Sequence, residues 1–129
     1  MIRRLLITGS RWWADWTIPY YALAAEWVAT GGTAILVSGA CPPRRDGTPG
    51  ADRICEATWE NFGGAVERYP ARWDLYGKRA GFIRNREMAE LPDVYKCLGF
   101  KLNNSSGTAN CMEWAQKNGI PVSPFEKWS

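Results

Sequence analysis

Three short segments combine glycine with polar side chains, a combination that suits the binding of anionic ligands. The first segment is ITGSR, residues 7–11. In it, Gly9 would let the backbone turn close to a ligand, and Ser10 and Arg11 could donate hydrogen bonds to anionic oxygens. The simpler alternative is a turn between a strand and a helix with an exposed arginine. The dinucleotide pattern G-x-G-x-x-G does not occur here, which argues against a nicotinamide or flavin cofactor.

The second segment is GTPGADR, residues 47–53, a glycine-rich loop that would lead into a helix. It is not a P-loop, because the GK[ST] ending is missing. The free backbone N–H groups at the start of such a helix could still hold a phosphate. Asp52 could complement the helix dipole, or it could accept hydrogen bonds from ligand hydroxyls, and the sequence favours neither.

The third segment is NNSSGT, residues 103–108, which repeats the arrangement before a later helix. Ser106 could cap that helix, Gly107 would allow a ligand to approach closely, and Thr108 could donate a hydrogen bond. An ordinary capped helix would show the same residues. Two glycine-containing helix starts are together more specific for a phosphate-containing ligand than either one alone.

A fourth candidate is an amide inside an apolar stripe. Wound as a helix, residues 77–91 place Asn85 on the same face as Gly81, Phe82, Met88 and Ala89. A buried amide without a partner costs roughly 1–3 kcal/mol, and a glycine inside a helix costs about 0.5–1 kcal/mol relative to alanine. Two such violations within one turn favour a binding site, in which Gly81 makes room and Asn85 bonds to a ligand. The alternative is an Asn85 that fixes the preceding loop RWDLYG.

Apolar runs alternate with helical patterns along the chain. This alternation predicts one α/β domain over residues 1–129, a three-layer sandwich with helices on both faces of a mainly parallel five-stranded sheet. Ligands of such folds bind beyond the carboxyl ends of the strands, where the polar segments fall. The expected strands are 2–9, 33–39, 65–71, 94–100 and 120–125, and the expected helices are 17–32, 51–62, 77–91 and 107–118.

Composition limits the chemistry. The net charge of +3 is spread along the chain, which suits an anionic small ligand and makes nucleic acid an unlikely partner. Without histidine, histidine-based acid–base or triad chemistry is excluded, and four cysteines without a C-x-x-C pair do not indicate zinc, so neither a metal nor a cofactor is expected. Cys55 and Cys97 lie in apolar segments and are expected in the core. Nothing resembles a signal peptide or a membrane-spanning run, so we expect a cytoplasmic protein with reduced thiols.

Four stretches in this order resemble the YspA/cpYpsA-related branch of the SLOG superfamily: ITGSR, then LVSGA with GTPGADRICEATWENFG, then RYPARWDLYGKRAGFIRNREM, then SGT. The resemblance covers most of the chain. It implies a Rossmann-like fold related to the LOG phosphoribohydrolases and DprA, and a nucleotide or nucleotide-derived ligand. The implied site consists of Gly9, Ser10, Arg11, Gly39, Asp52, Arg84, Asn85, Gly107 and Thr108, to which we add Ser106 and Trp73 from their positions.

The first functional hypothesis is therefore a binding module, acting as a sensor or sequestering its ligand. Phosphate would lie on the helix starts, ribose near Asp52 and Asn85, and the base against Trp73 or Trp12. Arg11 and Arg84 would neutralise the phosphate charge.

Two alternatives come from the same resemblance. The first is a LOG-type phosphoribohydrolase that cleaves the N-glycosidic bond of nucleoside monophosphates. Arg84 is then the catalytic candidate, since Arg84 and Met88 match the arginine and methionine of the LOG signature, but Cys111 stands where its glutamate would be. The second is a DprA-like binder of single-stranded nucleic acid, ranked last because the charge is modest. The resemblance and the eight tryptophans also suggest a homodimer or a higher homo-oligomer.

Overall fold

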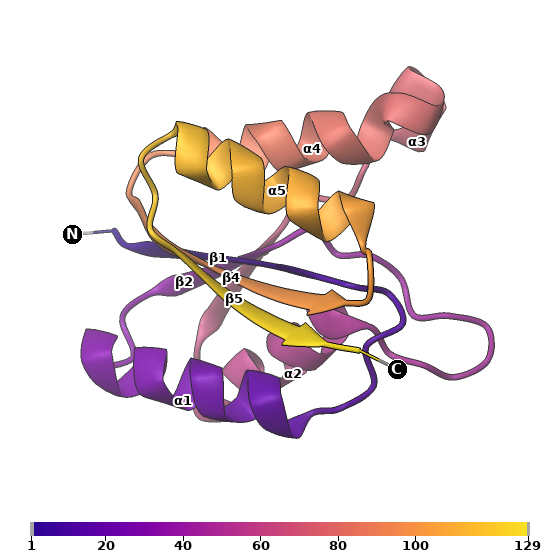
Figure 1. Ribbon diagram of the computed structural model, residues 1–129. Helices are drawn as coiled ribbons and strands as arrows, with labels where there is room; N and C mark the ends of the chain where they lie inside the picture. Colours follow the sequence, from indigo (N-terminus) through magenta and orange to yellow (C-terminus); the bar gives the residue numbers. More distant parts are fainter. Residues whose placement is uncertain (1, 129) are drawn as a thin grey trace.

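Five parallel strands form the middle layer of the computed structural model, which describes residues 2–128 (Figure 1). The strand order is β3-β2-β1-β4-β5, and every neighbouring pair is parallel. The predicted fold class, an α/β sandwich with a five-stranded sheet, is confirmed. The strands are β1 (Arg4–Gly9), β2 (Ile35–Ser38), β3 (Ala65–Arg68), β4 (Val94–Leu102) and β5 (Val122–Lys127).

Helices cover both faces of the sheet (Figure 1). On one face lie α1 (Thr17–Thr30) and α2 (Ala51–Phe62), and on the other lie α4 (Ala80–Ala89) and α5 (Ser106–Lys117). The short helix α3 (Trp73–Tyr76) and the 3-10 helix η1 (Gly77–Arg79) lead into α4. Among the described residues, no helix is both long enough and apolar enough to cross a membrane.

Some predicted boundaries were wrong. The helix expected from residue 77 begins at Ala80 as an α-helix, and the segment expected as a loop before it contains α3. Strands β4 and β5 run further than predicted, because Lys101 pairs with Glu126 and Leu102 pairs with Lys127. Three of these four residues are charged and lie on the edge pair of the sheet, so an apolar pattern could not mark this end.

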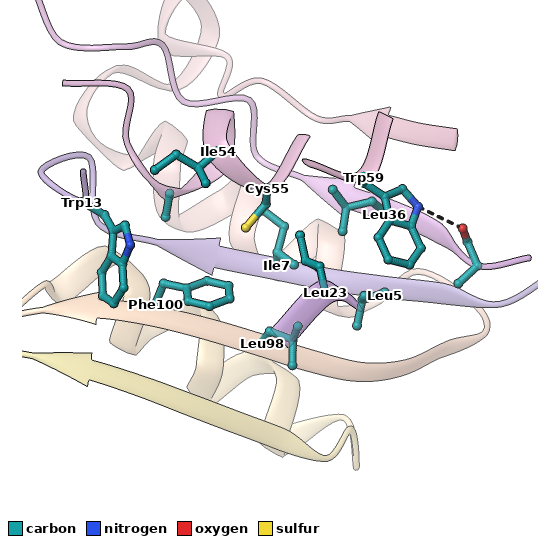
Figure 2. Close-up of a cluster of buried hydrophobic side chains, with 12 residues drawn as sticks. Leu5, Ile7, Trp13, Leu23, Leu36, Ile54, Cys55, Trp59, Leu98 and Phe100 are labelled. Atoms are coloured by element: carbon teal, nitrogen blue, oxygen red, sulfur yellow. Dashed lines mark hydrogen bonds between the residues drawn. The ribbon is translucent and has the colours of Figure 1, made fainter. Parts of the chain in front are cut away.

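Strand β1 is buried on both faces and connects two cores. Leu5 and Ile7 pack against α1 and α2, whereas Leu6 packs on the opposite side with residues of α4 and α5, as the two-residue period of a strand requires. In the first core, Trp59 is fully buried and its indole N–H donates to the Ala34 carbonyl at 3.2 Å (Figure 2). Cys55 is buried in the first core and Cys97 in the second, as predicted.

Gly9 ends β1 where α2 comes closest to the sheet. A Cβ atom at this position would collide with the Cβ of Ala51 and would lie 2.9 Å from the carbonyl oxygen of Phe100. The missing side chain therefore allows α2 to pack on β1 and β4, a reason that the sequence did not reveal.

We expect Gly9→Ala to lower the free energy of unfolding by about 2 kcal/mol, because an overpacked core costs about 1–3 kcal/mol. The matched control is Gly107→Ala, where the added Cβ would meet no atom within 4 Å, and where alanine favours the helix. Urea denaturation of both variants checks this. Equal stability of Gly9→Ala and wild type would show that the contact relaxes freely.

Candidate functional site

A cavity of about 1180 Å³ lies at the carboxyl ends of β1, β2 and β4. This is the edge at which the arrowheads of β4 and β5 point in Figure 1. The strand order reverses between β1 and β4, which is where ligands of doubly wound sheets bind. The structure brings every predicted site residue to the wall of this cavity: Gly9, Ser10, Arg11, Gly39, Asp52, Trp73, Arg84, Asn85, Ser106, Gly107 and Thr108.

Arg84 is held in place on α4 by three acceptors. Its Nη1 donates to the carbonyl oxygens of Gly39 at 2.5 Å and Tyr69 at 3.3 Å, and its Nε donates to Asn85 Oδ1 at 3.0 Å. The guanidinium is half-buried and forms part of the cavity wall. A positive charge fixed in this way is ready for an anionic group without further ordering of the side chain.

Gly39 makes room for that guanidinium. A Cβ on Gly39 would lie 2.6 Å from Arg84 Nη1 and 2.7 Å from Arg84 Cζ. The close stacking of the arginine on the end of β2 thus depends on glycine, and this gives Gly39 a physical role.

Replacing Gly39 by alanine should therefore displace Arg84 with little harm to the fold. The clashing group is the end of a flexible side chain, so we expect the free energy of unfolding to change by less than about 1 kcal/mol. We expect affinity for an anionic ligand to fall about tenfold, because one charge-assisted hydrogen bond is weakened.

A double-mutant cycle checks this coupling by calorimetric titration. In an Arg84→Gln background, Gly39→Ala should cause no further loss of affinity. Additive losses would contradict the coupling, as would a Gly39→Ala variant that binds like wild type.

Asn85 is buried, and its hydrogen bonds explain why an amide lies on the apolar face of α4. Its Nδ2 donates to the Gly107 carbonyl and to Asn110 Oδ1, both at 3.2 Å, while its Oδ1 accepts from Arg84. Asn85 therefore joins α4 to the first turn of α5 and orients Arg84. It does not fix the segment 72–77, which was the alternative prediction. Asn110 was not identified from the sequence, although it lies one turn after Gly107 on the same helix face.

The face predicted around Asn85 is only partly correct. Met88 and Ala89 are buried, but Phe82 is 47% exposed, and Ala80 is buried at the start of the helix. The open side of Gly81 faces the indole of Trp73, whose ring atom would lie 3.6 Å from an added Cβ.

The start of α5 is open to the cavity. Ser105, and not Ser106 as predicted, is the N-cap residue, and its Oγ bonds to Thr108 Oγ1 at 2.8 Å. No side chain among the described residues caps the backbone of this helix. The first amide bonded within the helix is that of Ala109, so the three N–H groups before it are available, and nothing lies near the open side of Gly107.

The start of α2 is closed, which corrects the prediction of a phosphate cradle at residues 47–53. The amide of Gly50 donates to the Trp13 carbonyl at 3.1 Å, and that of Ala51 donates to the Ser10 carbonyl at 3.0 Å. The loop after β1 thus occupies the donors that a phosphate would need. From residues 47–53, only Asp52 lines the cavity.

Asp52 lies in the cavity wall and is 6% exposed. Its Oδ2 accepts a hydrogen bond from the Cys41 amide at 3.0 Å. Burial raises the pKa of the Asp52 carboxyl to about 6, although the Cys41 amide and the charge of Arg84 act in the opposite direction and Glu56 adds to the rise. Among the described residues that line the cavity, Asp52 is the only acid.

The rim of the cavity is basic and aromatic. Arg11 and Lys78 are exposed there and add positive charge to that of Arg84. Trp12 and Trp73 are 58% and 60% exposed. The Arg44 guanidinium lies 3.0 Å from the centroid of the Trp12 ring and covers one face of it, so Trp73 is the more accessible surface for a flat ligand group.

Cys111, at the position of the LOG glutamate, does not face the cavity. It is fully buried beside Leu6, Val37 and Met88 in the second core. Within residues 2–128, no three side chains of histidine, cysteine, aspartate or glutamate converge as metal ligands.

Comparison with known proteins shows a similarity to a phage protein. The chain is 42% identical over 130 residues to the Gene 61 protein of Mycobacterium phage D29, and the match covers 96% of this chain and 97% of that protein. No family model and no solved structure matches the chain.

Proposed function

The chain belongs to the family of the Gene 61 protein of Mycobacterium phage D29, and we propose that it binds a nucleotide or a nucleotide-derived molecule at the carboxyl edge of its sheet. The observation that carries this proposal is the uncapped start of α5, which faces a large cavity beside the immobilised guanidinium of Arg84. The resemblance to the SLOG superfamily supports the same ligand class. In this proposal the protein is a sensor or a sequestering module.

The phosphate of the ligand lies at the first turn of α5. The amides of Ser106, Gly107 and Thr108 precede the first intrahelical hydrogen bond, and the helix dipole favours negative charge at this end. Arg84 is held beside them through Asn85, which contacts both Arg84 and Gly107. Arg11 and Lys78 at the rim raise the positive potential that attracts an anion.

The base of the ligand stacks on Trp73. This ring is exposed, lines the cavity and has the glycine surface of Gly81 behind it. Stacking of a base on an aromatic side chain contributes about 1–3 kcal/mol and tolerates any base, so this contact supplies affinity more than selectivity.

Hydrolysis of the N-glycosidic bond is a second candidate function, favoured by one observation. The pKa of Asp52, raised to about 6, suits an acid–base group near neutral pH. The usual carboxylate of LOG enzymes is missing, because Cys111 takes its place in the core. Release of free base from nucleoside monophosphates, lost in Asp52→Asn, would establish this activity.

Thermal unfolding with a panel of ribonucleoside monophosphates, dinucleotides and cyclic ADP-ribose tests the proposed function. A ligand at about 100 times its dissociation constant should add about 2.7 kcal/mol, which is several degrees for a domain of this size. The control variant is Gly107→Leu, which fills the open side of the α5 start. A shift in wild type that disappears in Gly107→Leu supports the proposal, and a flat panel contradicts it.

The homo-oligomer stays a prediction. Exposed aromatic side chains at the start of α1, Trp16 just before the helix and Tyr21 on it, form a surface that a second copy would cover. Size-exclusion chromatography with light scattering measures the mass, and a monomer at high concentration would contradict the prediction.

A further inference from the structure

The Asp52 carboxylate has one satisfied oxygen and one open oxygen. Oδ2 accepts from the Cys41 amide, whereas Oδ1 has no hydrogen-bond partner among the described residues. No fully buried side-chain oxygen or nitrogen in that part of the chain lacks a partner, so Oδ1 must retain access. Because the residue is 6% exposed and lines the cavity, this access leads into the cavity.

No cation forms an ion pair with this carboxylate among the described residues, although the charge of Arg84 acts on it from a distance. Within residues 2–128, Asp52 takes part in no ion pair, and the hydrogen bonds of Arg84 go to Gly39, Tyr69 and Asn85 instead. A buried, unpaired carboxyl is unfavourable for the fold, and proteins keep such groups where a ligand uses them. Oδ1 of Asp52 can therefore accept a hydrogen bond from a donor on a ligand.

We propose that Asp52 accepts a hydrogen bond from a sugar hydroxyl of the bound nucleotide and thereby selects ribose over deoxyribose. This inference rests on the proposed function and names the ligand subclass of the same site.

Two features of the cavity identify the donor as a sugar hydroxyl. The three cationic side chains Arg11, Lys78 and Arg84 line the same cavity, which disfavours a cationic amine as the donor. The aromatic side chains that can stack a base, Trp73 and Phe82, lie at the exposed rim, while Asp52 lies in the buried wall. With the base at the rim, the sugar is the part of the ligand that reaches the carboxylate.

Calorimetric titration with matched pairs of ligands tests the inference. Adenosine monophosphate is compared with its 2′-deoxy and 3′-deoxy forms. The guanosine, cytidine and uridine monophosphates test whether the affinity depends on the base. The variants are Asp52→Asn and, as control, Asp93→Asn, an exposed residue just before β4 at the opposite edge of the sheet. In Asp52→Asn the amide oxygen must face the Cys41 N–H, so the cavity receives an NH₂ donor in place of the charged acceptor.

For wild type and Asp93→Asn, we expect the ribonucleotide to bind at least about tenfold tighter than one of its deoxy forms. In Asp52→Asn, the ratio should fall below about threefold, while affinity for that deoxy form stays within about twofold of wild type. A purely structural role of Asp52 would weaken both ligands equally and leave the ratio unchanged.

The outcomes separate this inference from the proposed function. Binding without a preference between the sugars overturns the inference and leaves nucleotide binding intact. The inference is also overturned if Asp52→Asn still prefers the ribonucleotide. The same holds if affinity depends on the identity of the base and not on the sugar. If no ligand of the set binds, the proposed function falls and the inference falls with it.

Discussion

Replacing Arg84 by glutamine is expected to weaken nucleotide binding about 100-fold. Glutamine removes the charge and the forked donor geometry, and a charge-assisted hydrogen bond to phosphate is worth about 1.5–3 kcal/mol. The effect should be large because the wild-type side chain is fixed by Gly39, Tyr69 and Asn85 before the ligand arrives.

Two further variants make this result specific. Arg84→Lys keeps the charge but not the fork, so we expect a loss of about tenfold. Arg86→Gln is the matched control, because Arg86 lies on the same helix, is exposed and pairs with Glu90 away from the cavity. Calorimetric titration measures the affinities, and circular dichroism confirms folding. If Arg84→Gln binds the nucleotide as tightly as Arg86→Gln does, Arg84 is not part of the binding site.

Replacing Asp52 by asparagine is expected to stabilise the fold at neutral pH by up to about 3 kcal/mol. The folded protein raises the pKa of Asp52 from 3.8 to about 6, chiefly through burial. Between these values the folded state binds more protons than the unfolded state, so stability falls as pH rises from about 4 to about 6 and stays reduced above. This difference corresponds to about 3 kcal/mol. Asparagine is neutral throughout and keeps an oxygen for the Cys41 amide, so it avoids the loss.

Urea denaturation of wild type and Asp52→Asn at pH of about 4 and about 7.5 measures this. The difference in stability should be small at the lower pH, where the folded carboxyl is protonated, and should be largest at the higher pH. A difference that does not depend on pH, or a less stable variant at neutral pH, would contradict the account. If Asp52→Asn is more stable than wild type but discriminates poorly between ribose and deoxyribose, the wild-type protein gives up stability in order to bind its ligand selectively.

The order of strands and helices could be predicted because the pattern along each element is local. Strand β2 shows it well: the continuous apolar run of residues 33–39, bounded by glycines, indicated burial on both faces, and the structure places Leu36 in the first core and Val37 in the second. Helix α3 was missed because four residues are too few to show a helical period. The ends of β4 and β5 were missed because three of the four residues in their last two pairs are charged.

The residues of the cavity could be predicted, but their roles could not. The starts of α2 and α5 look alike as sequence, yet carbonyls of the loop after β1 occupy the first and leave the second open. That difference depends on residues more than 30 positions apart, such as Ser10 and Ala51, and no local pattern contains it. Asn85 was recognised as a polar residue in the wrong place, but its partner Asn110 became known only from the packing of α4 on α5.

An NMR titration of the amide resonances with a ribonucleoside monophosphate tests the central claim most directly. The account predicts that the resonances of Ser106, Gly107 and Thr108 move most, because their N–H groups receive the phosphate. The molecule offers an alternative location, a groove of about 600 Å³ between α1 and β5 lined by Tyr21 and Phe125. Shifts gathered at that groove, or binding that leaves the start of α5 unchanged, would contradict the claim.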